Sequence, residues 1–143
     1  KDEWVRLTFL GGARQVGRSA LFLQTMESRI LIDCGVDVTQ SDENAYPHLE
    51  VPEFSISDLD AVIISHAHLD HVGFLPYLYK FGFRGPTYCT APTRDMAALL
   101  LLDFVKIMKS ENKEPIYDVE DVKEMIKHTV SVRFLRCSSP SRR

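Results

Sequence analysis

The sequence of 143 residues has few cysteines, no long apolar run and little net charge. The three cysteines, Cys34, Cys89 and Cys137, lie far apart and form neither a CxxC pair nor a disulfide framework, which favours a reducing, cytoplasmic setting. No apolar run approaches the ~20 residues that cross a bilayer, and the amino terminus KDEWVRLTF has no signal-peptide pattern, so we expect no membrane partner. A net charge of −3 gives no general attraction to nucleic acid.

What is present is the composition of an ordinary globular domain. Hydrophobic residues make up 45% of the chain and charged residues 26%, both close to the averages for globular proteins. The length fits one domain with a sizeable core. Because the sequence starts without methionine, we expect it to be cut from a longer chain.

Short apolar runs predict strands at residues 5–10, 19–25, 29–35, 59–65 and 87–91. The first three follow one another closely, as strands of antiparallel hairpins do. The run LDAVIIS is rich in β-branched residues, which predicts a strand buried on both faces. The polar segment DVTQSDENAYPHLEVPEFS, broken by two prolines, is expected to be a loop.

Helical spacing of apolar residues appears in the second half of the chain. It predicts a helix from Asp70 that Gly82 closes, and a shorter helix over residues 119–128 with Asp118 as its cap. Between them, Thr93 is the expected cap of a long helix whose apolar residues are dense enough to imply burial.

The last stretch of the chain differs from the rest. Residues 131–143 (SVRFLRCSSPSRR) follow no period and end in serine, proline and arginine. We therefore predict a folded portion at residues 1–130 and an atypical, disordered tail at residues 131–143.

The stretch SHAHLDHVG crowds three of the five histidines into six positions, at the carboxyl end of the predicted strand 59–65. In an extended chain His66 and His68 project the same way, so both imidazoles can reach one ion. Asp70 and His71 follow where a helix begins, which lets the chain aim them at a second point nearby. Imidazole with carboxylate suits zinc, manganese or iron better than calcium. Four such donors in six positions predict a metal site rather than ordinary core or surface histidines.

These residues resemble a known family. HAHLDH is similar to the HxHxDH motif of the metallo-β-lactamase superfamily. The segments LGGARQVGRSALFLQT, ILIDCGV, VIISHAHLDHVGFLPYL and TAPTRDMAALLLLDFVKI look like its β-CASP branch, and within it like archaeal relatives of the RNA-cleaving subunit of the cleavage and polyadenylation specificity factor. The resemblance covers residues 4–130.

The resemblance implies an α/β fold, the αββα sandwich, and a set of site residues. His66 and His68 would ligate a first zinc ion, and Asp70 and His71 a second. Asp33 would support the site through hydrogen bonds, as residues that orient metal ligands do. The implied reaction is hydrolysis of an RNA phosphodiester by metal-bound hydroxide, in RNA 3′-end processing or decay, with Asp33 and Asp70 as catalytic residues.

The family's remaining metal ligands have no counterpart in this sequence. We therefore expect only the amino-terminal half of the sandwich, with one apolar face exposed and a tendency to form homodimers or aggregates. Two alternatives stay open: another hydrolase on the same scaffold, such as a thioesterase, and a non-catalytic fragment. The first would be revealed by turnover of a thioester rather than RNA, and the second by weak metal binding.

Several other residues have side chains that could take part in a site or contact a substrate. Cys34 is expected to be a buried, inert thiol, and Asp103 either a buried hydrogen-bonding partner or a surface carboxylate. His48 and His128 are expected at the surface, outside the metal site. Four arginines could approach a phosphate backbone, although solvation is the default for each: Arg14, Arg18, Arg84 and Arg94.

Overall fold

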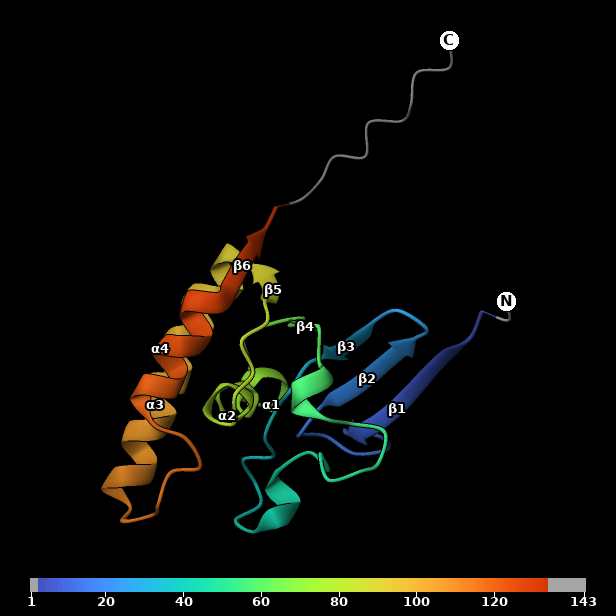
Figure 1. Cartoon of the computed structure of the whole chain (residues 1–143). Helices are drawn as coiled ribbons and strands as arrows, with labels where there is room; N and C mark the ends of the chain where they lie inside the picture. Colours follow the sequence, from blue (N-terminus) through green and yellow to red (C-terminus); the bar gives the residue numbers. More distant parts are fainter. Residues whose placement is uncertain (1–2, 134–143) are drawn as a thin grey trace.

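The computed structural model describes residues 3–133, which form a six-stranded sheet and four α-helices (Figure 1). The strands are β1 (Val5–Gly11), β2 (Ala20–Thr25), β3 (Arg29–Ile32), β4 (Ala61–Ile63), β5 (Thr87–Thr90) and β6 (Thr129–Val132). The helices are α1 (Leu69–Val72), α2 (Leu75–Lys80), α3 (Ala91–Ser110) and α4 (Val119–His128), with short 3-10 helices η1 (Glu43–Ala45) and η2 (Ile56–Asp58). None of the helices within residues 3–133 is long and apolar enough to cross a membrane.

The strands lie in the sheet in the order of the chain. β1, β2 and β3 pair antiparallel, as the short turns predicted, while β3 to β6 pair parallel. Parallel strands need crossover connections, and here these are the loop with η1 and η2, then α1 with α2, then α3 with α4. The carboxyl ends of β3, β4 and β5 therefore meet at one edge of the sheet. That edge is where the chain places the residues that follow those strands.

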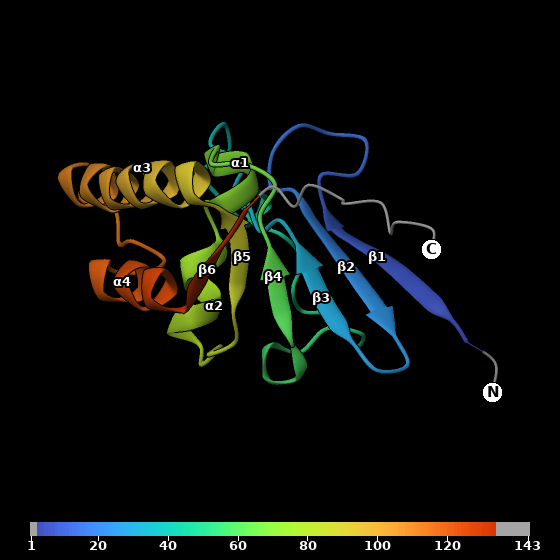
Figure 2. The same ribbon diagram turned by 90° about the horizontal axis from the view of Figure 1, so that it is seen from above.

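One face of the sheet carries the core. Phe22, Leu31 and Val62 lie side by side across β2, β3 and β4, are at most 1% exposed, and pack with residues of the helices. The loop after β3 closes the same face near β2, where Phe54 meets Phe22 edge-to-face at 5.1 Å between ring centroids. Figures 1 and 2 show α2, α3 and α4 gathered at the β5–β6 end of the sheet, away from β1.

The other face of the sheet, the open face, is apolar and uncovered within the described residues. A ladder of paired residues crosses all six strands on this face: Phe9, Leu21, Ile32, Ile63, Tyr88 and Val130. Phe9 is 64% exposed, Ile63 41% and Val130 45%. The prediction that the strand at 59–65 is buried on both faces is therefore wrong for Ile63, because no element of residues 3–133 covers that side.

The helices differ from their predictions in three details. The predicted helix from Asp70 is two short helices, because the helix is interrupted at Gly73, between α1 and α2. Gly82, at φ +99°, follows α2 and ends it as predicted. α3 begins at Ala91, with Thr90 rather than Thr93 as its cap, since the Thr90 hydroxyl accepts from the Thr93 amide. α3 is also less buried than its density of apolar residues predicts. Three of its residues are buried, while others, Leu99 among them, are largely exposed.

The carboxyl-terminal strand, β6, extends into the segment that the sequence predicts as a tail. β6 includes Ser131 and Val132, so regular structure continues two residues past the predicted limit at 130. The rest of the predicted tail, residues 134–143, lies outside the described residues.

Candidate metal centre

The turn that carries the candidate ligands is held by backbone hydrogen bonds from two other segments. α1 is a single turn, so its carbonyl groups have almost no partners within the helix. Instead, the Val36, Ser19 and Cys34 amides donate to the carbonyls of Leu69, Asp70 and His71, at 2.9, 2.9 and 2.8 Å. These bonds fix the turn against the ends of β3 and of the β1–β2 connection.

Two glycines allow this close approach. A β-carbon on Gly35 would lie 1.7 Å from the Asp70 carbonyl oxygen, and one on Gly73 would lie 2.5 Å from the Leu69 carbonyl oxygen. A β-carbon on Gly73 would also lie 2.6 Å from Cγ2 of Val36, so glycine is needed here for the close approach of the segment after β3. Gly35, which sequence reasoning missed, brings the end of β3 against α1. The buried Tyr117 hydroxyl also donates to the Gly73 carbonyl at 2.6 Å, which ties the end of α1 to the α3–α4 connection.

The structure brings three of the four predicted ligands together. Ligand atoms of His66, Asp70 and His71 all lie within 4.8 Å of one another, and all three side chains are partly buried. The rings of His66 and His71 are 4.0 Å apart between centroids. Two imidazoles and one carboxylate are a donor set that suits zinc and similar metals.

His68 stands beside this group rather than within it. Its ring meets the His66 ring edge-on, 4.9 Å between centroids, and it is the residue from which α1 begins, with extended backbone and an exposed side chain. The division of the four donors into two pairs, His66 with His68 and Asp70 with His71, thus stays a prediction.

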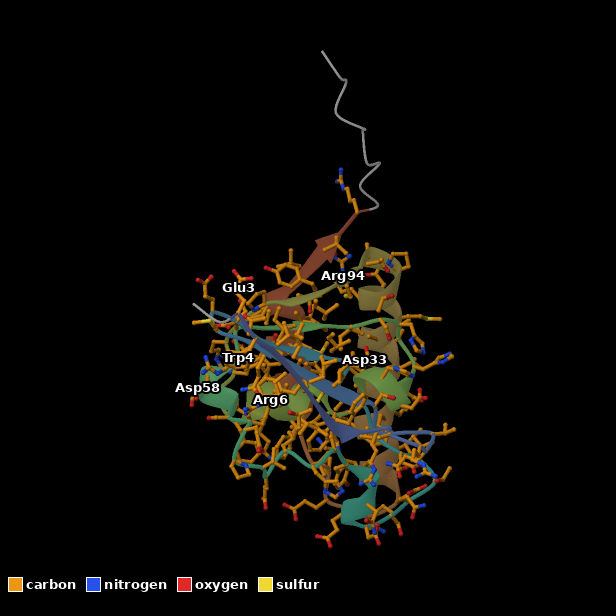
Figure 3. All side chains as sticks on the ribbon, turned by 90° about the vertical axis from the view of Figure 1, so that its right-hand side faces the viewer. Glu3, Trp4, Arg6, Asp33, Asp58 and Arg94 are labelled. Atoms are coloured by element: carbon orange, nitrogen blue, oxygen red, sulfur yellow. The ribbon has the colours of Figure 1, made fainter. Side chains whose placement is uncertain are left out.

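Asp33 (labelled in Figure 3) follows β3, and its carboxylate contacts several groups of the site. The residue ends β3 with φ at +60°, a left-handed conformation that aspartate tolerates better than most residues. Its Oδ1 accepts from the Ser65 amide and its Oδ2 from the Ser65 hydroxyl, both at 2.8 Å. Oδ2 also contacts His71 Nδ1 at 2.8 Å. Because an ionised carboxylate only accepts, Nδ1 of His71 carries its proton and Nε2 keeps the lone pair that a metal needs.

The surroundings of the site are apolar on two sides. Cys34 is fully buried, and desolvation, followed by the charge of Asp33, raises the pKa of its thiol, as expected for an inert cysteine. A hollow of about 350 Å³ adjoins His68 and Asp70, and exposed side chains of Val16 and Val38 form part of its wall. The site therefore opens onto a mostly apolar surface.

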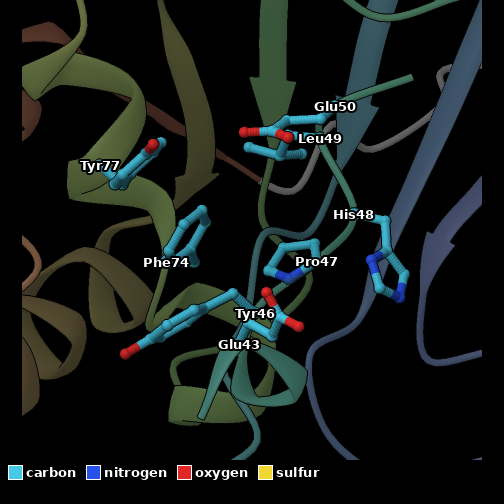
Figure 4. Close-up of a pocket in the computed structure, with 8 residues that line it drawn as sticks. All are labelled: Glu43, Tyr46, Pro47, His48, Leu49, Glu50, Phe74 and Tyr77. Atoms are coloured by element: carbon cyan, nitrogen blue, oxygen red, sulfur yellow. The ribbon is translucent and has the colours of Figure 1, made fainter.

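A second cavity of about 350 Å³ contains none of the five predicted site residues (Figure 4). The rings of Tyr46, Phe74 and Tyr77 stack along its wall, at 5.1 and 4.4 Å between centroids, and Glu43 and Glu50 stand at its rim. It holds no cluster of metal-binding or nucleophilic side chains, so we do not assign the chemistry to it.

The remaining candidates have structural partners or face solvent. Asp103 is exposed on α3, which settles its two alternatives in favour of the surface. Arg18 donates to the Tyr46 carbonyl and contacts the exposed His48, while His128 Nδ1 contacts the Glu124 carbonyl. Two other arginines also have partners, since Arg84 bonds to two carbonyls and Arg94 to Asp95 and Ser131.

The mixed sheet and the histidine–aspartate cluster beside the carboxyl ends of its parallel strands define an α/β domain with a candidate metal site. A family model described as a metallo-beta-lactamase superfamily domain matches residues 22–141. The chain belongs to the metallo-β-lactamase superfamily.

Similar proteins show which members of the superfamily this chain resembles. The chain is 54% identical over 133 residues to the transcription termination factor FttA of Methanocaldococcus jannaschii, and 49% identical over 141 residues to that of Pyrococcus horikoshii. These matches cover 93% and 94% of this chain but 21% and 22% of the relatives, so the chain spans about a fifth of their length. The resemblance to an archaeal β-CASP type is confirmed by these relatives.

A solved structure gives the same fold. The metallo-β-lactamase with a HARLDQ motif from Cronobacter sakazakii matches with a TM-score of 0.50 at 25% identity, over 65% of this chain and 35% of that one. The predicted α/β fold class, present in part, is therefore confirmed.

Proposed function

We propose that this chain carries part of the metal centre of a zinc-dependent ribonuclease that acts in the cytoplasm, in RNA 3′-end processing or decay. The observation that carries the proposal is the convergence of His66, Asp70 and His71 within 4.8 Å, with the Nε2 atom of His71 turned toward the Asp70 carboxylate, 3.4 Å from its Oδ2. The printed name of the relatives, transcription termination factor, is in keeping with RNA as the substrate class.

The donor set fits the metal that the family implies. His66, His68, Asp70 and His71 would hold two zinc ions together with ligands that this chain does not supply. When bound, the ions would activate water and neutralise charge on the phosphate. The chain itself positions the donors: backbone bonds hold α1, and Asp33 keeps the proton of His71 on Nδ1.

Zinc binding by the 143-residue chain tests the metal part of this proposal. After dialysis against zinc, elemental analysis should find bound zinc in the wild type and little in His66→Ala or His71→Ala. His48→Ala is the matched control, because His48 is exposed on the loop before η2 and lies outside the cluster. Equal zinc in all four proteins would contradict the proposal.

The substrate class needs a separate measurement. Labelled RNA and a thioester are each incubated with the zinc-loaded protein, beside its Asp70→Asn variant. We expect RNA to be cleaved by the wild type and not by the variant. Turnover of the thioester alone would support the thioesterase alternative, and no turnover of either would support a non-catalytic role.

A further inference from the structure

We propose that Ser65 is a positioning residue that selects which nitrogen of His66 faces the metal centre. The inference rests on the proposed metal centre and deepens it. Ser65 lies just after β4 and just before the first candidate ligand. Its hydroxyl stands between two groups of the site, 2.8 Å from Asp33 Oδ2 and 2.9 Å from His66 Nδ1.

The direction of both hydrogen bonds follows from counting protons. A hydroxyl has one proton to donate, and an ionised carboxylate can only accept. The Ser65 proton therefore goes to Asp33, and the Ser65 oxygen is left as an acceptor toward His66. His66 must then carry its proton on Nδ1, so its Nε2 atom keeps the lone pair.

The same carboxylate oxygen controls two imidazoles. Asp33 Oδ2 accepts directly from His71 Nδ1, at 2.8 Å, and reaches His66 through the Ser65 hydroxyl. Both rings thus carry a proton on Nδ1 and keep the Nε2 lone pair for a metal. The Nε2 atom of His71 lies 3.4 Å from Asp70 Oδ2, and the two rings lie 4.0 Å apart between centroids. The hydrogen bond made by one ring nitrogen decides the role of the other, and mutation of such partners of metal ligands typically costs about 10–100-fold in metal affinity.

The hydroxyl role can be separated from the backbone role of the same residue. The Ser65 amide donates to Asp33 Oδ1 at 2.8 Å, and any side chain at this position keeps that bond. Ser65 is also exposed, so a somewhat larger side chain has room. Threonine and valine have nearly the same shape and differ in the hydroxyl, which makes Ser65→Thr and Ser65→Val a matched pair.

The experiment compares the wild type with both variants by nitrogen-15 NMR of the imidazoles, at a pH of about 8.5 where histidine is mostly neutral. We expect His66 to hold its proton on Nδ1 in the wild type and in Ser65→Thr, and to lose that preference in Ser65→Val. His128 is the internal reference, because its Nδ1 faces the Glu124 carbonyl at 2.9 Å and should not respond. A His66 that keeps its proton on Nδ1 in Ser65→Val would overturn the proposal.

Zinc affinity is the second readout. By competition with a chelator, Ser65→Val should bind zinc about 10–100-fold more weakly than the wild type, while Ser65→Thr should stay close to it. Equal affinities for the matched pair would also overturn the proposal. If Ser65→Val does not fold, Ser65→Ala removes the hydroxyl without adding atoms and is compared with Ser65→Thr in the same way.

The two proposals fail in different ways. A wild type that binds no zinc contradicts the metal centre, while the NMR comparison still decides whether Ser65 sets the tautomer of His66. A wild type that binds zinc as tightly as Ser65→Val leaves the metal centre in place and removes the role of the hydroxyl.

Discussion

A β-carbon at Gly35 would lie 1.7 Å from the carbonyl oxygen of Asp70, much closer than two non-bonded atoms can lie unless the chain moves. The contact joins the end of β3 to the turn that carries the candidate ligands. A residue without a functional group therefore helps to fix the position of the candidate metal site.

Gly35→Ala is therefore expected to lower the free energy of unfolding by about 1–3 kcal/mol or more, as overpacking does, and to weaken zinc binding. Gly82→Ala is the matched control. Gly82 has open space around it but a φ of +99°, so its substitution should cost about 1 kcal/mol of conformational energy without affecting the site. Urea unfolding and zinc titration of both variants check this. Unchanged zinc affinity in Gly35→Ala would show that the turn adapts.

The buried thiol predicts a pH dependence of stability. Burial raises the pKa of Cys34, so above a pH of about 8.5 the unfolded chain releases a proton that the native chain keeps. Stability then falls as pH rises, by up to about 1.4 kcal/mol per pH unit for this one group. The slope of unfolding free energy against pH should be shallower by that amount in Cys34→Ala. Cys89→Ala serves for comparison, because burial raises the pKa of this thiol as well. Parallel slopes in the wild type and Cys34→Ala would contradict the prediction.

The open face predicts self-association of the 143-residue chain. Light scattering during size-exclusion chromatography should give a mass above that of the monomer, 16.3 kDa. Phe9→Lys places a charge on the open face and should shift the chain toward monomer. Leu99→Lys is the control, since Leu99 is 67% exposed on α3 rather than on the sheet. A monodisperse wild-type monomer would count against this prediction.

Substitution of the two threonines at the start of α3 is expected to lower stability by different amounts. Thr90→Ala removes the oxygen that accepts from the Thr93 amide, and should cost about 1 kcal/mol of stability. Thr93→Ala leaves that acceptor in place and should cost less. Thermal or urea unfolding of both variants distinguishes them, and a larger loss in Thr93→Ala would restore the cap that the sequence suggested.

The pattern of residues was enough to predict most strands and α4. β1 and β2 lie where short apolar runs placed them, and Asp118 caps α4 as predicted, with Asp121 completing a capping box. These features depend on neighbours in the chain, so local spacing determines them. The metal motif belongs to the same class, since four donors lie within six positions of the sequence.

The tertiary structure decided what depends on distant segments. Asp33 reaches Ser65 and His71 because β3 and β4 are parallel neighbours whose carboxyl ends meet at one edge of the sheet. The need for glycine at position 35 arises from the approach of α1, which no local pattern reveals. Ile63 looked like a core residue because hydrophobicity indicates what a side chain can pack against, whereas exposure depends on which elements are there to cover it. The sequence by itself thus indicated the candidate ligands and determined most of the strands, and only the packing of β3 against β4 and α1 decided how those candidate ligands are held.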